Sequence, residues 1–183
     1  MVRVYNKCRK SKVFKGHYID IPGRKFLVNF IRAEVKRNKN HFPRNIKIYI
    51  YDNDCDNCTS IAHDNSDLTI NLAELLHYYK KQESISRDIP DFKNFKAQIL
   101  FALYHELGHS KLRRFYYNYQ ESEYKKDRHI FELQADKFAR LYLKKRGVLN
   151  GDWLAGAKVK EIDKYILKLC LDNGLDNEDF NND

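Results

Sequence analysis

From Asp91 to Arg114 the chain reads DFKNFKAQILFALYHELGHSKLRR, and this stretch decides the fold. Apolar side chains recur in it at steps of three and four, the spacing that places them on one face of a helix. The stripe consists of Phe92, Phe95, Ile99, Leu103 and Leu107. Pro90 precedes the stretch, where a missing amide proton does no harm to a helix start. The stretch therefore predicts a long, mostly buried helix.

The run His105-Glu106-Leu107-Gly108-His109 stands late on this helix. Two imidazoles four residues apart point the same way from a helix and can hold one divalent metal, and the glutamate between them can reach a metal-bound water. Alternatively, both histidines are ordinary buried or surface side chains. Because buried imidazoles need partners or a metal, the context favours one Zn²⁺ per chain, with His105 and His109 as ligands and Glu106 as the catalytic base.

A third ligand is expected, because a catalytic zinc usually keeps three protein ligands and one open position. A second helical pattern, HIFELQADKFARLYLKKRG, runs from His129 to Gly147 and ends on a cationic turn and a glycine. Glu132 and Asp136 share one face of that helix. We predict Glu132 as the third ligand, and Asp136 as the acceptor for the other ring proton of a zinc histidine.

These two carboxylates have an alternative interpretation, a solvated acidic edge with Lys137 and Arg140 as partners. However, Ala135 and Ala139 bracket Asp136. Small residues at this spacing let two helices approach closely, which a metal shared between the helices requires.

The two motifs together resemble those of gluzincin-type metallopeptidases, above all the ImmA/IrrE family. The resemblance spans roughly residues 67–143 and rests on HELGH and on ELQADKFA at residues 132–139. It implies a zincin-like fold, the same ligands and base, and an intracellular protease. Several family members cleave a transcriptional repressor. Gln134 and Arg113 differ from the residues that the family often carries at their positions, and neither is a ligand.

The reaction that this resemblance implies is metal-assisted hydrolysis of a peptide bond. Zinc lowers the pKa of its bound water and polarises the carbonyl, while Glu106 takes the water proton and passes it to the leaving amine. An oxyanion donor is also needed, and the candidates stand between and at the ends of the two helices: Tyr116, Tyr117, Tyr119, Tyr124 and His129. His129 is also the alternative third ligand, because it lies three residues before Glu132.

The residues before the motif predict one helix and two strands. Residues 25–37 carry Phe26, Leu27, Phe30, Ile31 and Val35 at helical spacing, whereas residues 46–50 and 67–72 alternate between apolar and polar side chains, as half-buried strands do. Together with the motifs they predict an α+β fold, and the resemblance implies that this fold is a zincin-like metallopeptidase domain. In it, a small, mainly antiparallel sheet packs on the active-site helix and the second metal-bearing helix. By the resemblance, the strand at 67–72 is an edge strand that binds extended substrate; the alternative is an ordinary strand of the sheet.

The chain of 183 residues is 43% hydrophobic, so it can bury one substantial core. We expect a single domain over residues 1–171, followed by a flexible acidic tail at 172–183. No apolar run is long enough to span a membrane, and the first residues lack the apolar core of a secretory signal. These features predict no membrane partner and a cytoplasmic location.

The loop at residues 52–58 carries Cys55 and Cys58 among alternating aspartates. It lacks the glycine and the final glutamate of a calcium loop. A structural zinc would need two ligands beyond these cysteines. We therefore expect reduced thiols in a polar loop; the alternative is a second metal site completed by Cys8 or His63.

The formal net charge is +9, spread over several clusters of lysine and arginine. Such a surface attracts polyanions, although no helix-turn-helix, zinc-finger or RNA-recognition signature accompanies it. The expected function is a zinc-dependent endopeptidase that acts on a cytosolic protein, with a transcriptional regulator as one candidate. The alternative is a non-catalytic zincin-fold module that binds nucleic acid or a protein partner through its basic surface.

Overall fold

A computed structural model describes residues 1–8, 13–14, 17–18, 21, 23–52, 59–62, 65–81, 95–116 and 121–144. The chain divides into two compact units. Unit 1 comprises Met1–Ile89 and Asn94–Ala102, and unit 2 comprises Pro90–Lys93 and Leu103–Asp183. The expected domain end at residue 171 and the tail at 172–183 lie outside the described residues.

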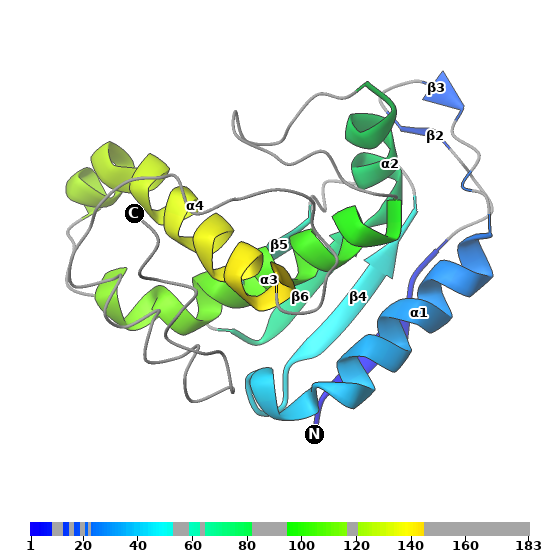
Figure 1. Ribbon diagram of the computed structural model, residues 1–183, viewed down its shortest axis with the longest axis horizontal. Coiled ribbons are helices and arrows are strands. Elements are labelled where there is room, and N and C mark those ends of the chain that lie inside the picture. Colours follow the sequence, from blue (N-terminus) through cyan, green and yellow to red (C-terminus); the bar gives the residue numbers. More distant parts are fainter. Residues whose placement is uncertain are drawn as a thin grey trace. The chain divides into compact units, whose positions relative to one another are not determined.

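Unit 1 is built around a four-stranded mixed sheet (Figure 1). Its strands stand in the order β1 (Arg3–Asn6), β4 (Lys47–Tyr51), β6 (Asp67–Asn71) and β5 (Ser60–Ile61). The β1–β4 and β4–β6 pairs are parallel, and only β5 pairs antiparallel, with β6. A separate two-stranded ladder joins β2 (Val13–Phe14) to β3 (His17–Tyr18). The sheet is therefore mixed, and the prediction of a mainly antiparallel sheet is wrong.

The chain connections explain the parallel pairing. Between β1 and β4 the chain passes through helix α1 (Arg24–Arg37) and the short 3₁₀ helix η1 (Lys39–His41), and such a crossover returns the chain in the same direction. Between β4 and β6 it first forms β5, so that β6 again runs parallel to β4. Side-chain alternation identifies a strand but is identical for both directions. The sequence pattern thus carried no information about strand direction.

The predicted strands at 46–50 and 67–72 and the helix at 25–37 are confirmed as β4, β6 and α1. On one sheet face Ile48, Ile50, Leu68 and Ile70 are completely buried. Helix α1 runs along the sheet (Figure 1) and buries Leu27, Val28, Ile31 and Val35. Phe26, which the spacing placed in the same stripe, is instead 56% exposed. Strand β6 has neighbours on both sides, so it is not the edge strand that the resemblance implied.

Helix α1 begins beside the end of β4. Gly23 precedes the helix with φ at +65°, a conformation that glycine adopts without strain. Arg24 donates to Asp52, which ties the first turn of α1 to the residue after β4. A cavity of about 590 Å³ lies there, lined by residues 21, 23–26, 29 and 52. None of its lining residues was predicted as a site residue.

Helix α2 (Leu72–Lys81) follows β6 directly and was not predicted. The side chain of Asn71 caps it, since its Oδ1 accepts hydrogen bonds from the N–H groups of Ala73 at 3.1 Å and Glu74 at 3.2 Å. Glu74 in turn accepts a hydrogen bond from the N–H of Thr59. An asparagine followed three residues later by glutamate is a recognised signal of a helix start. Asn71 and Glu74 form this signal, so the start of α2 could have been predicted from the sequence.

The two long helices of the prediction are confirmed as α3 (Phe95–Tyr116) and α4 (Glu121–Lys144), although α4 begins before the expected His129. Ile99, Leu103 and Leu107 of the predicted stripe are completely buried. Phe92 and the loop cysteines Cys55 and Cys58 lie outside the described residues. Within the described part of the chain, no helix combines the length and apolarity needed to cross a membrane.

Replacing Asn71 with alanine is expected to lower the free energy of unfolding by about 1 kcal/mol, because two N–H groups at the start of α2 lose their acceptor. Asn71→Ser retains an oxygen acceptor and should lose less. Urea denaturation of both variants measures the difference. Equal stability of Asn71→Ala and the wild type would contradict the capping role.

Candidate metal centre

Helix α3 places two histidines on one face. Leu103, Tyr104 and Leu107 are completely buried, so the opposite side of the helix turn carries His105 and His109 toward a less enclosed region. Their side chains are 15% and 18% exposed. A separation of four residues sets the two imidazoles one above the other, and the ring centroids are 4.6 Å apart.

Helix α4 brings two carboxylates to the same place. Phe131, Ala135 and Ala139 form its buried side. Glu132 and Asp136, four residues apart, both contact His105. The Asp136 side chain is 3% exposed and that of Glu132 39%. The alternative interpretation of a solvated acidic edge therefore fails for Asp136.

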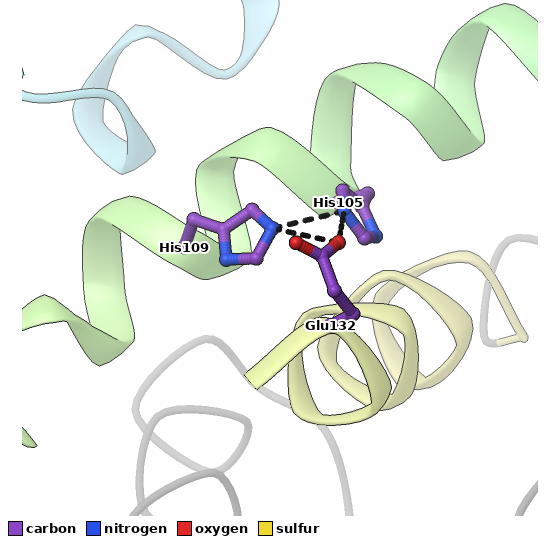
Figure 2. Close-up of side chains that lie close together, drawn as sticks. All are labelled: His105, His109 and Glu132. Carbon is purple, nitrogen blue, oxygen red and sulfur yellow. Dashed lines mark hydrogen bonds and ion pairs between the residues drawn. The ribbon is translucent and has the colours of Figure 1, made fainter. Parts of the chain in front are cut away.

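Three donor atoms converge on one point (Figure 2). The Nε2 atoms of His105 and His109 are 3.0 Å apart, and Oε2 of Glu132 lies 3.2 Å from the first and 3.4 Å from the second. Histidine, cysteine, aspartate and glutamate are the usual metal ligands, and among the described residues these three side chains form the group of that kind that could hold a metal ion. The structure thus brings together the three residues predicted as ligands.

The separations of the donors suit a small divalent metal. Zinc binds imidazole nitrogen and carboxylate oxygen at about 2.0–2.2 Å, and tetrahedral geometry then puts two ligand atoms about 3.3 Å apart. The observed 3.0–3.4 Å bracket this value. Two nitrogens and one oxygen are also donors that zinc commonly takes in proteins. The residues therefore fit the ion in both spacing and chemistry.

Asp136 fixes the orientation of His105. Its Oδ1 lies 2.7 Å from Nδ1 of His105, a length typical of a charge-assisted hydrogen bond. The carboxylate can only accept, so Nδ1 of His105 carries the proton. Nε2 lies 3.2 Å from Oε2 of Glu132, to which it donates when protonated, and loss of that proton frees its lone pair for a metal. This arrangement is how a carboxylate commonly prepares a histidine ligand for a metal.

The cluster attracts positive charge. Burial lowers the pKa of His105, but the hydrogen bonds to Asp136 and Glu132, together with the charge of Glu106, outweigh burial and raise it to about 10. Burial likewise raises the pKa of Glu132, but hydrogen bonds from the two imidazoles outweigh it and hold that pKa far below its usual range. The carboxylates around His105 thus make its imidazole hold protons tightly, and a divalent cation can replace the proton on Nε2.

Gly108 lets α3 and α4 approach closely. A Cβ atom at this position would lie 3.1 Å from both Cα and O of Ala135 and 3.2 Å from Cδ1 of Phe138. The two nearest atoms belong to the backbone of α4, so they cannot rotate away. The close approach that Ala135 and Ala139 predicted is therefore present. Gly108 itself was not predicted as a contact residue, although a glycine between the two motif histidines was the available signal.

Aromatic rings hold the two helices together beside the cluster. Tyr104 of α3 stacks on Tyr142 of α4 with ring centroids 4.1 Å apart, and Phe138, also on α4, lies beside Tyr142 with centroids 6.4 Å apart. The contact between the helices stabilises the pair by about 0.5–1.5 kcal/mol beyond the area that it buries. It reinforces the spacing set by Gly108.

The remaining predicted residues divide into two groups. Glu106 is buried on α3, and its charge acts on His105. Tyr117 and Tyr119 lie outside the described residues, and the side chains of Tyr116, Tyr124 and His129 are not among those described. Their roles as oxyanion donors, and that of His129 as alternative ligand, stay predictions.

Replacing Gly108 with alanine is expected to destabilise the fold by about 1–3 kcal/mol, because the added methyl group overlaps the backbone of α4. It should also weaken zinc binding, since the displaced helix carries Glu132. Thermal unfolding and competition with a chromophoric chelator measure the two effects. Ser110→Ala, two residues along α3, is the matched control and should behave as the wild type. A Gly108→Ala variant with normal stability and zinc affinity would refute the close-contact argument.

The metal-free protein is expected to lose stability as the pH rises from 6.5 to 9. The pKa of His105 is about 10 in the fold against 6.5 in the unfolded chain, so the folded state keeps a proton that the unfolded state releases, and the stabilisation is lost as the pH rises through this range. The test stops at pH 9 because a second group changes the stability at higher pH. Burial, followed by the charge of Asp52, raises the pKa of Cys8 from 9.0 to about 12.

Thermal midpoints measured with a chelator at each pH test this linkage. Asp136→Asn should flatten the profile, and Glu34→Gln, which also neutralises a buried helical carboxylate, should not. Parallel profiles for Asp136→Asn and the wild type would show that His105 is not the group responsible.

Comparison of the chain with models of protein families, with curated proteins and with solved structures gives no match. The geometry of the cluster is therefore the basis for a functional proposal.

Proposed function

We propose that the chain is a zinc-dependent endopeptidase with a zincin-like fold, in which His105, His109 and Glu132 bind one zinc ion and Glu106 is the general base. The observation that carries the proposal is the convergence of three donor atoms within 3.4 Å of one another, next in sequence to a buried carboxylate. The proposed substrate is a cytosolic protein, and a transcriptional regulator is one candidate.

The number and exposure of the ligands favour a catalytic over a structural metal. Structural zinc sites are closed by four protein ligands, whereas catalytic sites keep the fourth position for water or substrate. In the described part of the chain the cluster has three members. Because the Glu132 side chain is 39% exposed, water and a peptide can reach the donors.

The side chains around the donors suit hydrolysis of an amide bond. Zinc, when bound, acts as a Lewis acid that acidifies water and polarises a carbonyl. Glu106 accepts the proton of the attacking water and returns it to the leaving nitrogen, which must be protonated to depart as an amine. Asp136 keeps His105 in the tautomer that binds the metal.

Two imidazoles and one carboxylate are also the ligand set of iron(II) oxygenases. Oxygen activation takes place at the metal and does not require a carboxylate base beside the first ligand. Glu106 therefore favours a hydrolytic zinc centre. Metal analysis of the purified protein distinguishes zinc from iron directly.

Replacing Glu106 with glutamine is expected to lower hydrolysis by about 100- to 10,000-fold, because the amide cannot accept the water proton. Zinc should remain at about one ion per chain, since the three ligands are unchanged. A library of internally quenched fluorescent peptides reads the hydrolysis, and mass spectrometry of the metal reads the zinc.

Three further variants make this test specific. His105→Ala and Glu132→Ala should lose both zinc and hydrolysis, whereas Glu34→Gln, a buried carboxylate of α1, should keep both. The proposed mechanism is wrong if Glu106→Gln cuts the same peptides as fast as the wild type. If zinc stays bound in Glu132→Ala, the ligand assignment is wrong and His129 becomes the candidate.

A further inference from the structure

The sheet of unit 1 has two unlike faces. Side chains alternate between the faces of a strand, and the face that contains Ile48, Ile50, Leu68 and Ile70 is completely buried. The opposite face presents a different set of side chains, which we call the tyrosine face: Arg3, Tyr5, Lys47, Tyr49, Tyr51, Asp67 and Thr69. Arg3 and Lys47 are exposed, and the other five are partly exposed. Solvent therefore reaches this face.

The tyrosine rings form a continuous platform across two strands. Tyr5 of β1 is the register partner of Tyr49 of β4, and their rings stack with centroids 5.2 Å apart and an angle of 19° between the planes. Tyr51 continues the row, with its ring centroid 6.5 Å from that of Tyr49 and its plane tilted by 36°. A stacked pair and a tilted third ring on a sheet offer π surfaces to planar ligands.

Cations flank the platform. Nζ of Lys7 lies 6.0 Å from the centre of the Tyr49 ring. Arg3 and Lys47 are register partners in the next row of the same face. Lys47 approaches Asp67 only to 3.9 Å, and both side chains are more than two-fifths exposed, so the pair is weak and Lys47 can turn to another anion.

Stacked rings beside cations suit one class of polymer in particular. Bases of single-stranded nucleic acid stack on aromatic side chains of a sheet, and phosphates bind neighbouring lysine and arginine. An acidic peptide would use the cations without the rings, a neutral sugar would use the rings without the cations, and a duplex hides its base faces. The net charge of +9 adds long-range attraction for a polyanion.

We propose that the tyrosine face binds single-stranded nucleic acid, with bases stacked on Tyr5, Tyr49 and Tyr51 and phosphates held by Arg3, Lys7 and Lys47. This binding is independent of the proposed hydrolysis, because it uses none of the residues of the metal cluster. It would bring the chain to proteins that are themselves bound to nucleic acid.

Fluorescence anisotropy with a labelled oligothymidylate tests the proposal on the full chain. The wild type should bind the single strand more tightly than a duplex of equal length. Tyr49→Ala should weaken binding by about 5- to 150-fold through loss of base stacking, and Tyr49→Phe, which keeps the ring, should stay within about threefold. Lys47→Ala should reduce the slope of log affinity against log salt by about 0.7, the value for one phosphate contact on a single strand.

Lys39→Ala, which removes an exposed lysine of η1, is the matched control and should leave the slope nearly unchanged. Thermal unfolding of each variant separates loss of binding from loss of fold. The proposal is overturned if Tyr49→Ala and Lys47→Ala both bind as the wild type does, or if the duplex binds more tightly than the single strand. Displacement of the oligonucleotide by polyglutamate at equal charge would also overturn it, in favour of an acidic protein partner.

Discussion

The approach of α3 to α4 at Gly108 and Ala135 is the constraint on which the metal cluster depends. The donor atoms belong to two helices, and a shift of one helix by the radius of a methyl group would separate Glu132 from the imidazoles. A glycine on one helix and an alanine on the other remove the side chains that would force this shift. Backbone packing therefore sets donor separations that match a metal, and the stacking of Tyr104 on Tyr142 maintains them.

The charges of the cluster follow from the same packing. Once α4 lies against α3, Asp136 is buried next to His105, where an unpaired carboxylate would be costly. The imidazole of His105 retains its proton and so offsets the negative charge of Asp136. The excess of carboxylates over cations in a partly enclosed space accounts for the retained proton, and it would also favour a metal cation. A metal bound there as proposed would compete with protons for the same atoms.

Periodicity in the sequence was sufficient for the elements with a continuous buried stripe. The helices α1, α3 and α4 and the strands β4 and β6 were predicted, and a spacing of four residues on a helix was enough to propose the cluster. Strand direction could not be predicted, because parallel and antiparallel strands have the same alternation. Phe26 fits the stripe of α1 but lies at its margin, and α2 was missed because its evidence was a cap at Asn71 and not a long apolar pattern. Gly108 escaped notice because its importance depends on a neighbour in space.

All the donors of the cluster lie on two helices that are consecutive in the order of elements, whereas the sheet pairs β1 with β4, two strands that lie far apart in the chain. Contacts between nearby segments close small loops and form faster than contacts between distant ones. The helix pair that carries the candidate metal centre can therefore assemble before the parallel sheet does. If the cluster binds zinc as proposed, a nascent chain that has emerged past α4 would already offer a site for the ion, and metal supply would then act on the course of folding as well as on the finished protein.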